Sequence, residues 1–165
     1  MNDQDVRSAL LAGGIPAEDL DGDLSNHVAA YSGLFDPPGA EALGRSLSVA
    51  LRSSQPTLVV VWEDIENSVL AHIVARELGV TALRIIDASG VLDFDGSFGA
   101  DDRVVIVSDA FRTDFPINAM RALTENHGGQ VVAFGALIST PALVDAAGSI
   151  PVATLWGTQQ PSGGL

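Results

Sequence analysis

The chain has 165 residues, 47% of them hydrophobic, which is enough for one domain with a full buried core. Its 21 acidic and 8 basic residues give a formal net charge of −13, which disfavours nucleic acid and anionic lipid as partners. The sequence has no cysteine, which excludes disulfides, iron–sulfur clusters and thiolate nucleophiles. It also lacks the roughly 18 consecutive apolar residues of a membrane helix and the apolar run of a secretory signal, so we expect a cytoplasmic protein.

Hydrophobic periodicity and turn residues predict strands that alternate with helices along the chain. The expected helices cover 4–12, 39–52, 68–78, 115–127 and 141–147. The expected strands cover 27–35, 56–62, 82–86, 103–107, 131–138 and 151–156. A Gly- and Asp-rich segment at 87–102 is predicted to be a long loop, with or without a short hairpin.

This alternation predicts an α/β fold, a mostly parallel sheet with helices on both faces. We expect one domain over residues 1–156 and a mobile tail over 157–165. Ligands of such sheets bind at the carboxyl ends of the strands, so three loops, 63–68, 87–102 and 108–116, are expected to meet there.

The stretch 103–122 contains a buried strand, two polar positions and a Thr-containing turn that opens a helix. It resembles the phosphoribosyl pyrophosphate signature of type I phosphoribosyltransferases. In that family two adjacent acids hold the ribose hydroxyls, and the backbone N–H groups of the turn hold the 5′-phosphate. In this sequence Ser108 falls on the first acid, Asp109 on the second and Thr113 on the turn threonine.

The signature loop also departs from the family pattern. Residues 114–116 are Asp, Phe and Pro, where the family usually has Gly, Gly and Thr or Ser. Asp114 is well suited to cap the following helix, and we expect its carboxylate to occupy the position of the 5′-phosphate. The alternative is that Asp114 is an ordinary helix cap. In either case the phosphate site is blocked. Arg112 is either an anchor for an anion or a surface partner of Asp114. The resemblance implies a degenerate ligand-binding loop, made of Ser108, Asp109, Arg112, Thr113 and Asp114.

Within the family the likeness is to orotate phosphoribosyltransferases, and it covers most of the chain. It rests on ALLAGGI near the start, HVAAYSGLFDPP, SVLAHIVARELGV after the pyrophosphate loop, and SIPVATLW in the last strand. The resemblance implies the type I phosphoribosyltransferase fold. It also implies a homodimer, because sites in this family are often completed across a dimer interface.

The segment that matches the pyrophosphate loop carries acids where the family has a small, often Gly-containing turn. The segment runs from Trp62 to Asn67, with Ile65 in the middle. Its polar residues are Glu63, Asp64, Glu66 and Asn67. Two unit charges about 5 Å apart repel by about 3 kcal/mol at an effective dielectric constant near 20. Since millimolar to micromolar binding totals only about 4 to 8 kcal/mol, one carboxylate facing the ligand is enough to abolish binding unless Mg²⁺ intervenes.

The segment that matches the flexible catalytic loop, 85–102, has no basic residue. In the family this loop brings lysine and histidine over the departing pyrophosphate to stabilise its charge. Asp87, Asp93 and Asp95 stand there instead, so the leaving group lacks stabilisation.

Two further groups of residues have alternative interpretations. Glu63, Asp64, Glu66 and Asp109 either converge on an oxygen-rich site for Mg²⁺ or Ca²⁺ or are solvated loop acids. His72 in a helix is interpreted as a packed or solvated residue, and His127 in the last turn of a helix as a structural one.

These residues favour a degenerate phosphoribosyltransferase-fold protein that binds a partner protein or a non-phosphorylated or cationic ligand, without transferase activity or cofactor. The alternative is an active orotate-like transferase. In it Mg²⁺ screens the acids, Ser108 and Asp109 hold the ribose, and Arg112 with Thr113 holds the phosphate. A third interpretation is a regulatory subunit paired with a catalytic relative.

Overall fold

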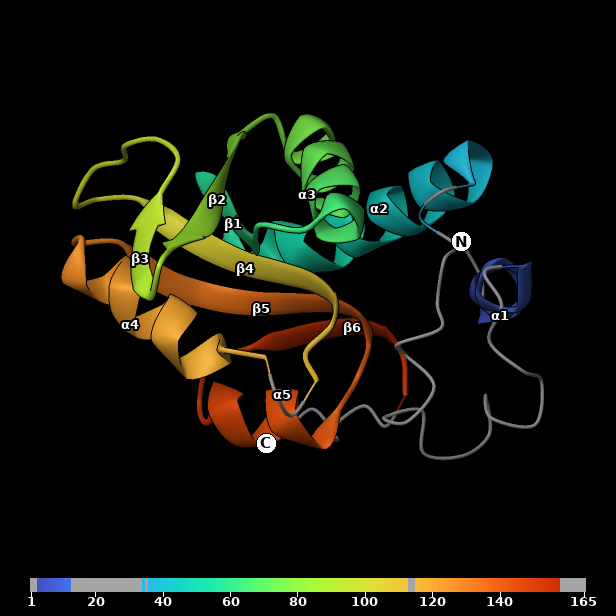
Figure 1. Ribbon diagram of the computed structural model, residues 1–165. Helices are drawn as coiled ribbons and strands as arrows, with labels where there is room; N and C mark the ends of the chain where they lie inside the picture. Colours follow the sequence, from blue (N-terminus) through green and yellow to red (C-terminus); the bar gives the residue numbers. More distant parts are fainter. Residues whose placement is uncertain (1–2, 13–33, 35, 113–114, 158–165) are drawn as a thin grey trace, which may run out of the picture.

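The computed structural model describes residues 3–12, 34, 36–112 and 115–157 (Figure 1). The helices are α1 (Asp3–Ala12), α2 (Pro37–Leu51), the 3₁₀ helix η4 (Arg52–Ser54), α3 (Ile65–Leu78), α4 (Ile117–Asn126) and α5 (Pro141–Ala147). The strands are β1 (Leu58–Trp62), β2 (Thr81–Ala88), β3 (Val91–Phe94), β4 (Arg103–Ala110), β5 (Gln130–Ile138) and β6 (Val152–Trp156). None of the helices in these ranges combines the length and apolar character needed to cross a bilayer.

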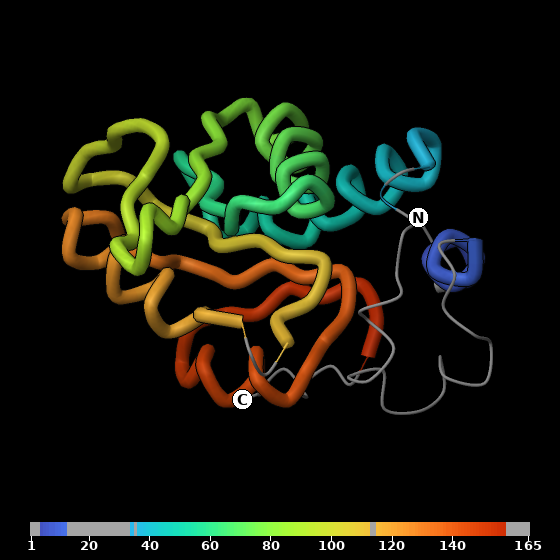
Figure 2. Tube along the Cα trace, viewed as in Figure 1, coloured from blue at the N-terminus to red at the C-terminus, as the bar shows by residue number. Residues whose placement is uncertain are grey.

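The strands form one six-stranded sheet in the order β3-β2-β1-β4-β5-β6. Strands β2, β1, β4, β5 and β6 run parallel, and β3 pairs antiparallel with β2 at the edge. The fold class predicted from the sequence is therefore confirmed. Strand β1 lies between β2 and β4, so the carboxyl ends of these three strands lie along one edge of the sheet. Figure 2 shows the same arrangement of helices and strands as a trace of the chain.

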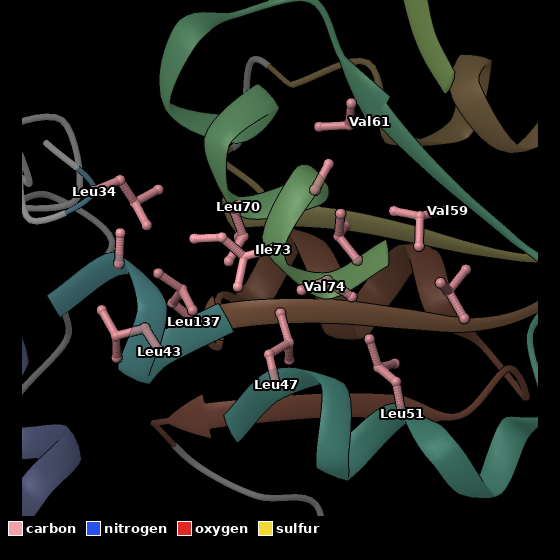
Figure 3. Close-up of a cluster of buried hydrophobic side chains, with 14 of the residues drawn as sticks. Leu34, Leu43, Leu47, Leu51, Val59, Val61, Leu70, Ile73, Val74 and Leu137 are labelled. Carbon is pink, nitrogen blue, oxygen red and sulfur yellow. The ribbon is translucent and has the colours of Figure 1, made fainter. Parts of the chain in front are cut away.

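Helices cover both faces of the sheet, and a separate hydrophobic cluster fills each side. Alternate residues of β4 point to opposite faces, so Val105 and Val107 belong to one cluster and Val104 and Ile106 to the other. On the first face, leucines of α2 and residues of α3 lie together over the sheet (Figure 3). The labelled members are Leu34, Leu43, Leu47, Leu51, Val59, Val61, Leu70, Ile73, Val74 and Leu137. Helices α4 and α5 lie on the opposite face.

The segment 87–102 is not one long loop. Strand β2 extends to Ala88, and β3 returns at Val91 after a two-residue turn. Both turn residues are left-handed, with φ of 58° at Ser89 and 87° at Gly90, and this conformation matches the twist of a tight hairpin. The predicted short hairpin is therefore present, and the rest of the segment, 95–102, is a loop that leads into β4.

Three predicted helix starts were wrong by two or three residues. Helix α2 begins at Pro37, two residues before its predicted start. Helix α3 begins at Ile65, because the Asp64 side chain caps its first turn. Helix α4 begins at Ile117, with Pro116 in the N-cap position and no side-chain hydrogen bond from it. The predicted strand at 27–35 lies outside the described residues except for Leu34, and so does the predicted tail from residue 158 onward.

Helices α2 and α3 approach closely at Gly44, which is buried. A Cβ atom at this position would lie 2.5 Å from Cγ2 of Ile73 and 2.8 Å from its Cβ. Both distances are shorter than van der Waals contact, and the Ile73 Cβ cannot move without the backbone of α3. The close spacing of α2 and α3 therefore depends on the absence of a side chain at Gly44.

We predict that Gly44→Ala lowers the free energy of unfolding by up to about 2 kcal/mol. Overpacking costs about 1 to 3 kcal/mol, and replacing a helical glycine returns about 1 kcal/mol. Urea unfolding followed by circular dichroism measures the change. Ser46→Ala, at a half-exposed position of the same helix, is the control and should cause no loss. A Gly44→Ala protein as stable as the wild type would show that the two helices can separate freely.

Candidate functional site

Three segments meet at the carboxyl edge of the sheet around a cavity of about 460 Å³. They are the turn after β1, the β2–β3 hairpin and the loop after β4, which the sequence placed together. The lining residues are Trp62, Asp64, Asp87, Leu92, Arg112, Phe115 and Pro116. Residues 113–114 lie outside the described part of the chain, so the roles expected for Thr113 and Asp114 stay predictions.

The turn after β1 is organised by the carboxylate of Asp64. Its Oδ1 accepts the backbone N–H of Asn67 at 2.7 Å, and its Oδ2 accepts the Asn67 side-chain amide at 2.6 Å. The Asp64 carbonyl also accepts the N–H of Ser68 at 3.0 Å, which starts the helix. A carboxylate of the protein therefore occupies the N-terminus of α3, where free N–H groups would otherwise attract an anion.

The side chain of Asn67 connects this turn to the end of β4. Asn67 is only 2% exposed, and its Oδ1 accepts the backbone N–H of Asp109 at 2.7 Å. The same amide group donates to Asp64 through Nδ2. The sequence placed Asn67 in the pyrophosphate-loop segment, but nothing local in the sequence signals this bridge to a residue 42 positions away.

Asp109 is turned into the protein and is only 6% exposed. Its Oδ1 accepts the N–H of Ala110 at 2.6 Å and the hydroxyl of the fully buried Ser108 at 3.1 Å. Burial raises the pKa of the Asp109 carboxyl, and the charge of Asp64 acts in the same direction. The Ala110 N–H, the Arg112 charge and the Ser108 hydroxyl oppose this shift.

The other acids of the turn do not gather around a metal position. The Oε1 atom of Glu63 accepts the backbone N–H of Asp87 at 2.8 Å, and Glu66 lies half-exposed in the first turn of α3. Over the described ranges, no three histidine, aspartate or glutamate side chains are grouped so that they could hold a metal ion. The alternative in which Glu63, Asp64, Glu66 and Asp109 form a metal site is therefore not found in the described residues. Glu63, Asp64 and Asp109 each accept a hydrogen bond from a different backbone N–H group.

A row of aromatic rings lies along the same edge, and the sequence analysis missed it. The rings of Trp62 and Phe115 are edge-to-face, with centroids 6.2 Å apart. Phe115 in turn packs against Phe111 at 5.4 Å, and Phe111 packs against Phe134 at 6.0 Å. The sequence pattern that could have predicted this row is an aromatic residue at the end of β1, Trp62, and two more in the loop after β4, Phe111 and Phe115. This loop is also fixed by Thr140, whose hydroxyl donates to the Phe111 carbonyl.

A second cavity, of about 790 Å³, lies over the N-terminal halves of α2 and α3. Its lining includes Asp64, the exposed Ile65 and His72, and it reaches Leu34, next to residues that the structure does not describe.

His127 caps the end of α4, and its Nδ1 lies 2.9 Å from the Leu123 carbonyl. His127 also packs edge-to-face against Phe94 at 5.2 Å, which agrees with the structural role expected for it.

We predict that Asp109→Asn is more stable than the wild type at pH 7. Because the folded-state pKa of Asp109 is raised, the native protein binds its proton more tightly than the unfolded chain does. Wild-type stability therefore falls as the pH rises from the ordinary aspartate range through the raised folded-state pKa, and asparagine removes this loss. Thermal unfolding at pH 4 and pH 7 should show a larger advantage of the variant at pH 7. Asp145→Asn, at an exposed position of α5, is the matched control. A variant less stable than the wild type at pH 7 contradicts the prediction.

Among sequences, no protein-family model and no curated protein matches this chain. Solved structures do match. Adenine phosphoribosyltransferase from Rhodothermus marinus superimposes with a TM-score of 0.68 at 18% identity, over 93% of this chain and 98% of that one. The Leishmania donovani adenine phosphoribosyltransferase gives 0.62 at 17% identity, over 81% and 75% of the two chains. Leishmania donovani UMP synthase gives 0.59 at 19% identity, over 74% of this chain and 27% of its own length. The chain therefore has the fold of the type I phosphoribosyltransferases.

Proposed function

We propose that this chain is a phosphoribosyltransferase-fold protein without transferase activity that acts as a binding or regulatory module. The observation that carries the proposal is the capping of α3 by Asp64. In a transferase of this fold the turn after β1 must receive a diphosphate, and here a carboxylate accepts the helix N–H groups in its place. Two unit charges about 5 Å apart repel by about 3 kcal/mol at an effective dielectric constant near 20, a large fraction of a micromolar binding energy.

The residues that would hold a ribose support the same proposal. Ser108 is fully buried and Asp109 nearly so, and they bond to each other and to Ala110. An acid that holds ribose hydroxyls must present its oxygens to the ligand. In this chain Oδ1 of Asp109 already accepts two protein hydrogen bonds.

The β2–β3 hairpin also supports the loss of transfer chemistry. Departure of pyrophosphate needs positive charge where negative charge develops. Between Thr81 and Phe94 the only basic residue is Arg84, and its Nε donates to Oδ2 of Asp95 at 2.6 Å. The two-residue turn at Ser89 and Gly90 leaves no long segment within the hairpin itself that could close over the cavity.

A Mg²⁺-dependent, orotate-like transferase remains the competing proposal. It is favoured by the fold and by Arg112, whose side chain lines the cavity together with Asp64 and Asp87. In such an enzyme Mg²⁺ would screen the two carboxylates from the diphosphate.

We predict that the purified protein does not bind phosphoribosyl pyrophosphate, with or without Mg²⁺, in calorimetric titration. We also predict no release of pyrophosphate when adenine or orotate is added with Mg²⁺. Repulsion by the acidic turn is the reason for both results. A micromolar dissociation constant that requires Mg²⁺, together with release of pyrophosphate, would establish the competing transferase instead.

A charge-removal experiment tests the repulsion itself. The double variant Glu63→Gln, Asp64→Asn should bind inorganic pyrophosphate at least about tenfold more tightly than the wild type, because it removes two charges from the turn. Asparagine still caps helices, and glutamine can still accept the Asp87 N–H, so the fold should persist. The control, Asp101→Asn with Asp145→Asn, removes the same charge from exposed positions elsewhere. Equal gains in both double variants would mean that net charge, and not the turn, governs anion affinity.

A further inference from the structure

We propose that the cavity at the carboxyl edge of the sheet binds an organic cation, namely an amine or guanidine carried on an aromatic body. This inference rests on the proposed function, since it assigns a different ligand to the site that a transferase would use for phosphoribosyl pyrophosphate. The cavity volume of about 460 Å³ suits a small molecule. Its lining comes from three separate segments, so it is a concave site and not a patch on one element.

The walls supply aromatic surface in a fixed orientation. Trp62 ends the central strand β1, and its ring meets the edge of Phe115 at a centroid distance of 6.2 Å. Phe115 is held by Phe111, which is fully buried, and Leu92 adds apolar surface from β3. The π faces of such rings attract cations and also pack against an aromatic ligand.

Two carboxylates lie in the same lining and are held in place by backbone groups. Asp64 is fixed by its bonds to Asn67, and Oδ1 of Asp87 accepts the N–H of Gly90 at 2.6 Å. A carboxylate has about four acceptor positions, so each of these two can accept further hydrogen bonds from a ligand. An ammonium or guanidinium group, which only donates, matches them.

The charge around the cavity is negative in sum. Asp64 and Asp87 line it, and the buried Asp109 lies near enough to Asp64 for their charges to repel. Among the described lining residues Arg112 is the one cation, and its charge favours the ionised form of Asp109. Two carboxylates and one guanidinium thus line the cavity, in a protein of net charge −13. This field attracts cations and repels phosphorylated ligands.

Three probes that share one aromatic body test the charge requirement. They are phenethylamine, phenethyl alcohol and 3-phenylpropionate, each titrated into the full-length protein and followed by calorimetry and by tryptophan fluorescence. We expect saturable binding of the amine, at least about tenfold weaker binding of the alcohol, and no binding of the carboxylate. Equal affinities for amine and alcohol, or no binding of the amine, would overturn the proposal.

Matched variants locate the site. Asp64→Asn and Asp87→Asn should each weaken phenethylamine binding about tenfold, and Trp62→Leu should weaken it while abolishing most of the fluorescence change. Asp93→Asn is the control and should bind as the wild type does, because Asp93 lies on β3 outside the lining of the cavity. If all three aspartate variants bind equally well, the amine binds elsewhere and the assignment is wrong.

The titration with phosphoribosyl pyrophosphate separates this inference from the proposed function. If neither the amine nor phosphoribosyl pyrophosphate binds, the cation site is wrong while the loss of transferase activity stands. If phosphoribosyl pyrophosphate binds with Mg²⁺ and is converted, the proposed function fails, and the cation site fails with it.

Discussion

The buried amide of Asn67 is the contact on which the carboxyl edge of the sheet depends. It donates to Asp64 in the turn after β1 and accepts from the backbone of Asp109 at the end of β4. Two loops that come from neighbouring parallel strands are thereby held in one arrangement. Because an unmade hydrogen bond inside a protein costs about 1 to 3 kcal/mol, neither loop can move away without leaving a buried polar group unsatisfied. The shape of the cavity between them follows from this bridge.

The same carboxylate that stabilises the turn determines which ligands it can accept. An aspartate at the N-cap satisfies a helix N–H and complements the helix dipole, which commonly contributes about 1 kcal/mol to stability. It also places a negative charge where an anionic ligand would need those N–H groups. Asp64 therefore links local stability to ligand class: the first turn of α3 is well capped, and the site favours positive charge.

The sequence was sufficient to predict the fold because its signals are local. The β-branched run Val104–Val107 and the alternation of strands with helices predict a buried parallel strand between helical layers, and the structure has this arrangement. Helix starts were less accurate, since Asp64 and Pro116 are both compatible with more than one starting residue. For the site, the sequence predicted the converging segments and named Asp64 and Arg112, which line the cavity. It also named Ser108 and Asp109, which are buried. The burial of Asp109 and its link to Asn67 join residues 42 positions apart, and no pattern within either segment encodes that pairing.

The two hydrophobic clusters explain how this fold can persist with a changed edge. Both are built from alternating strand residues and helix faces, such as Val105, Leu47 and Leu70, that do not line the cavity at the carboxyl edge. Packing of this kind tolerates extensive sequence change if volume and pattern are kept, which agrees with a TM-score of 0.68 at 18% identity. The charged residues of the edge, Asp64, Asp87 and Arg112, belong to neither cluster, so their charge can vary without loss of core packing. An acidic, aromatic cavity can therefore form at the carboxyl edge, where open parallel sheets commonly bind ligands, without any change in the sheet that supports it.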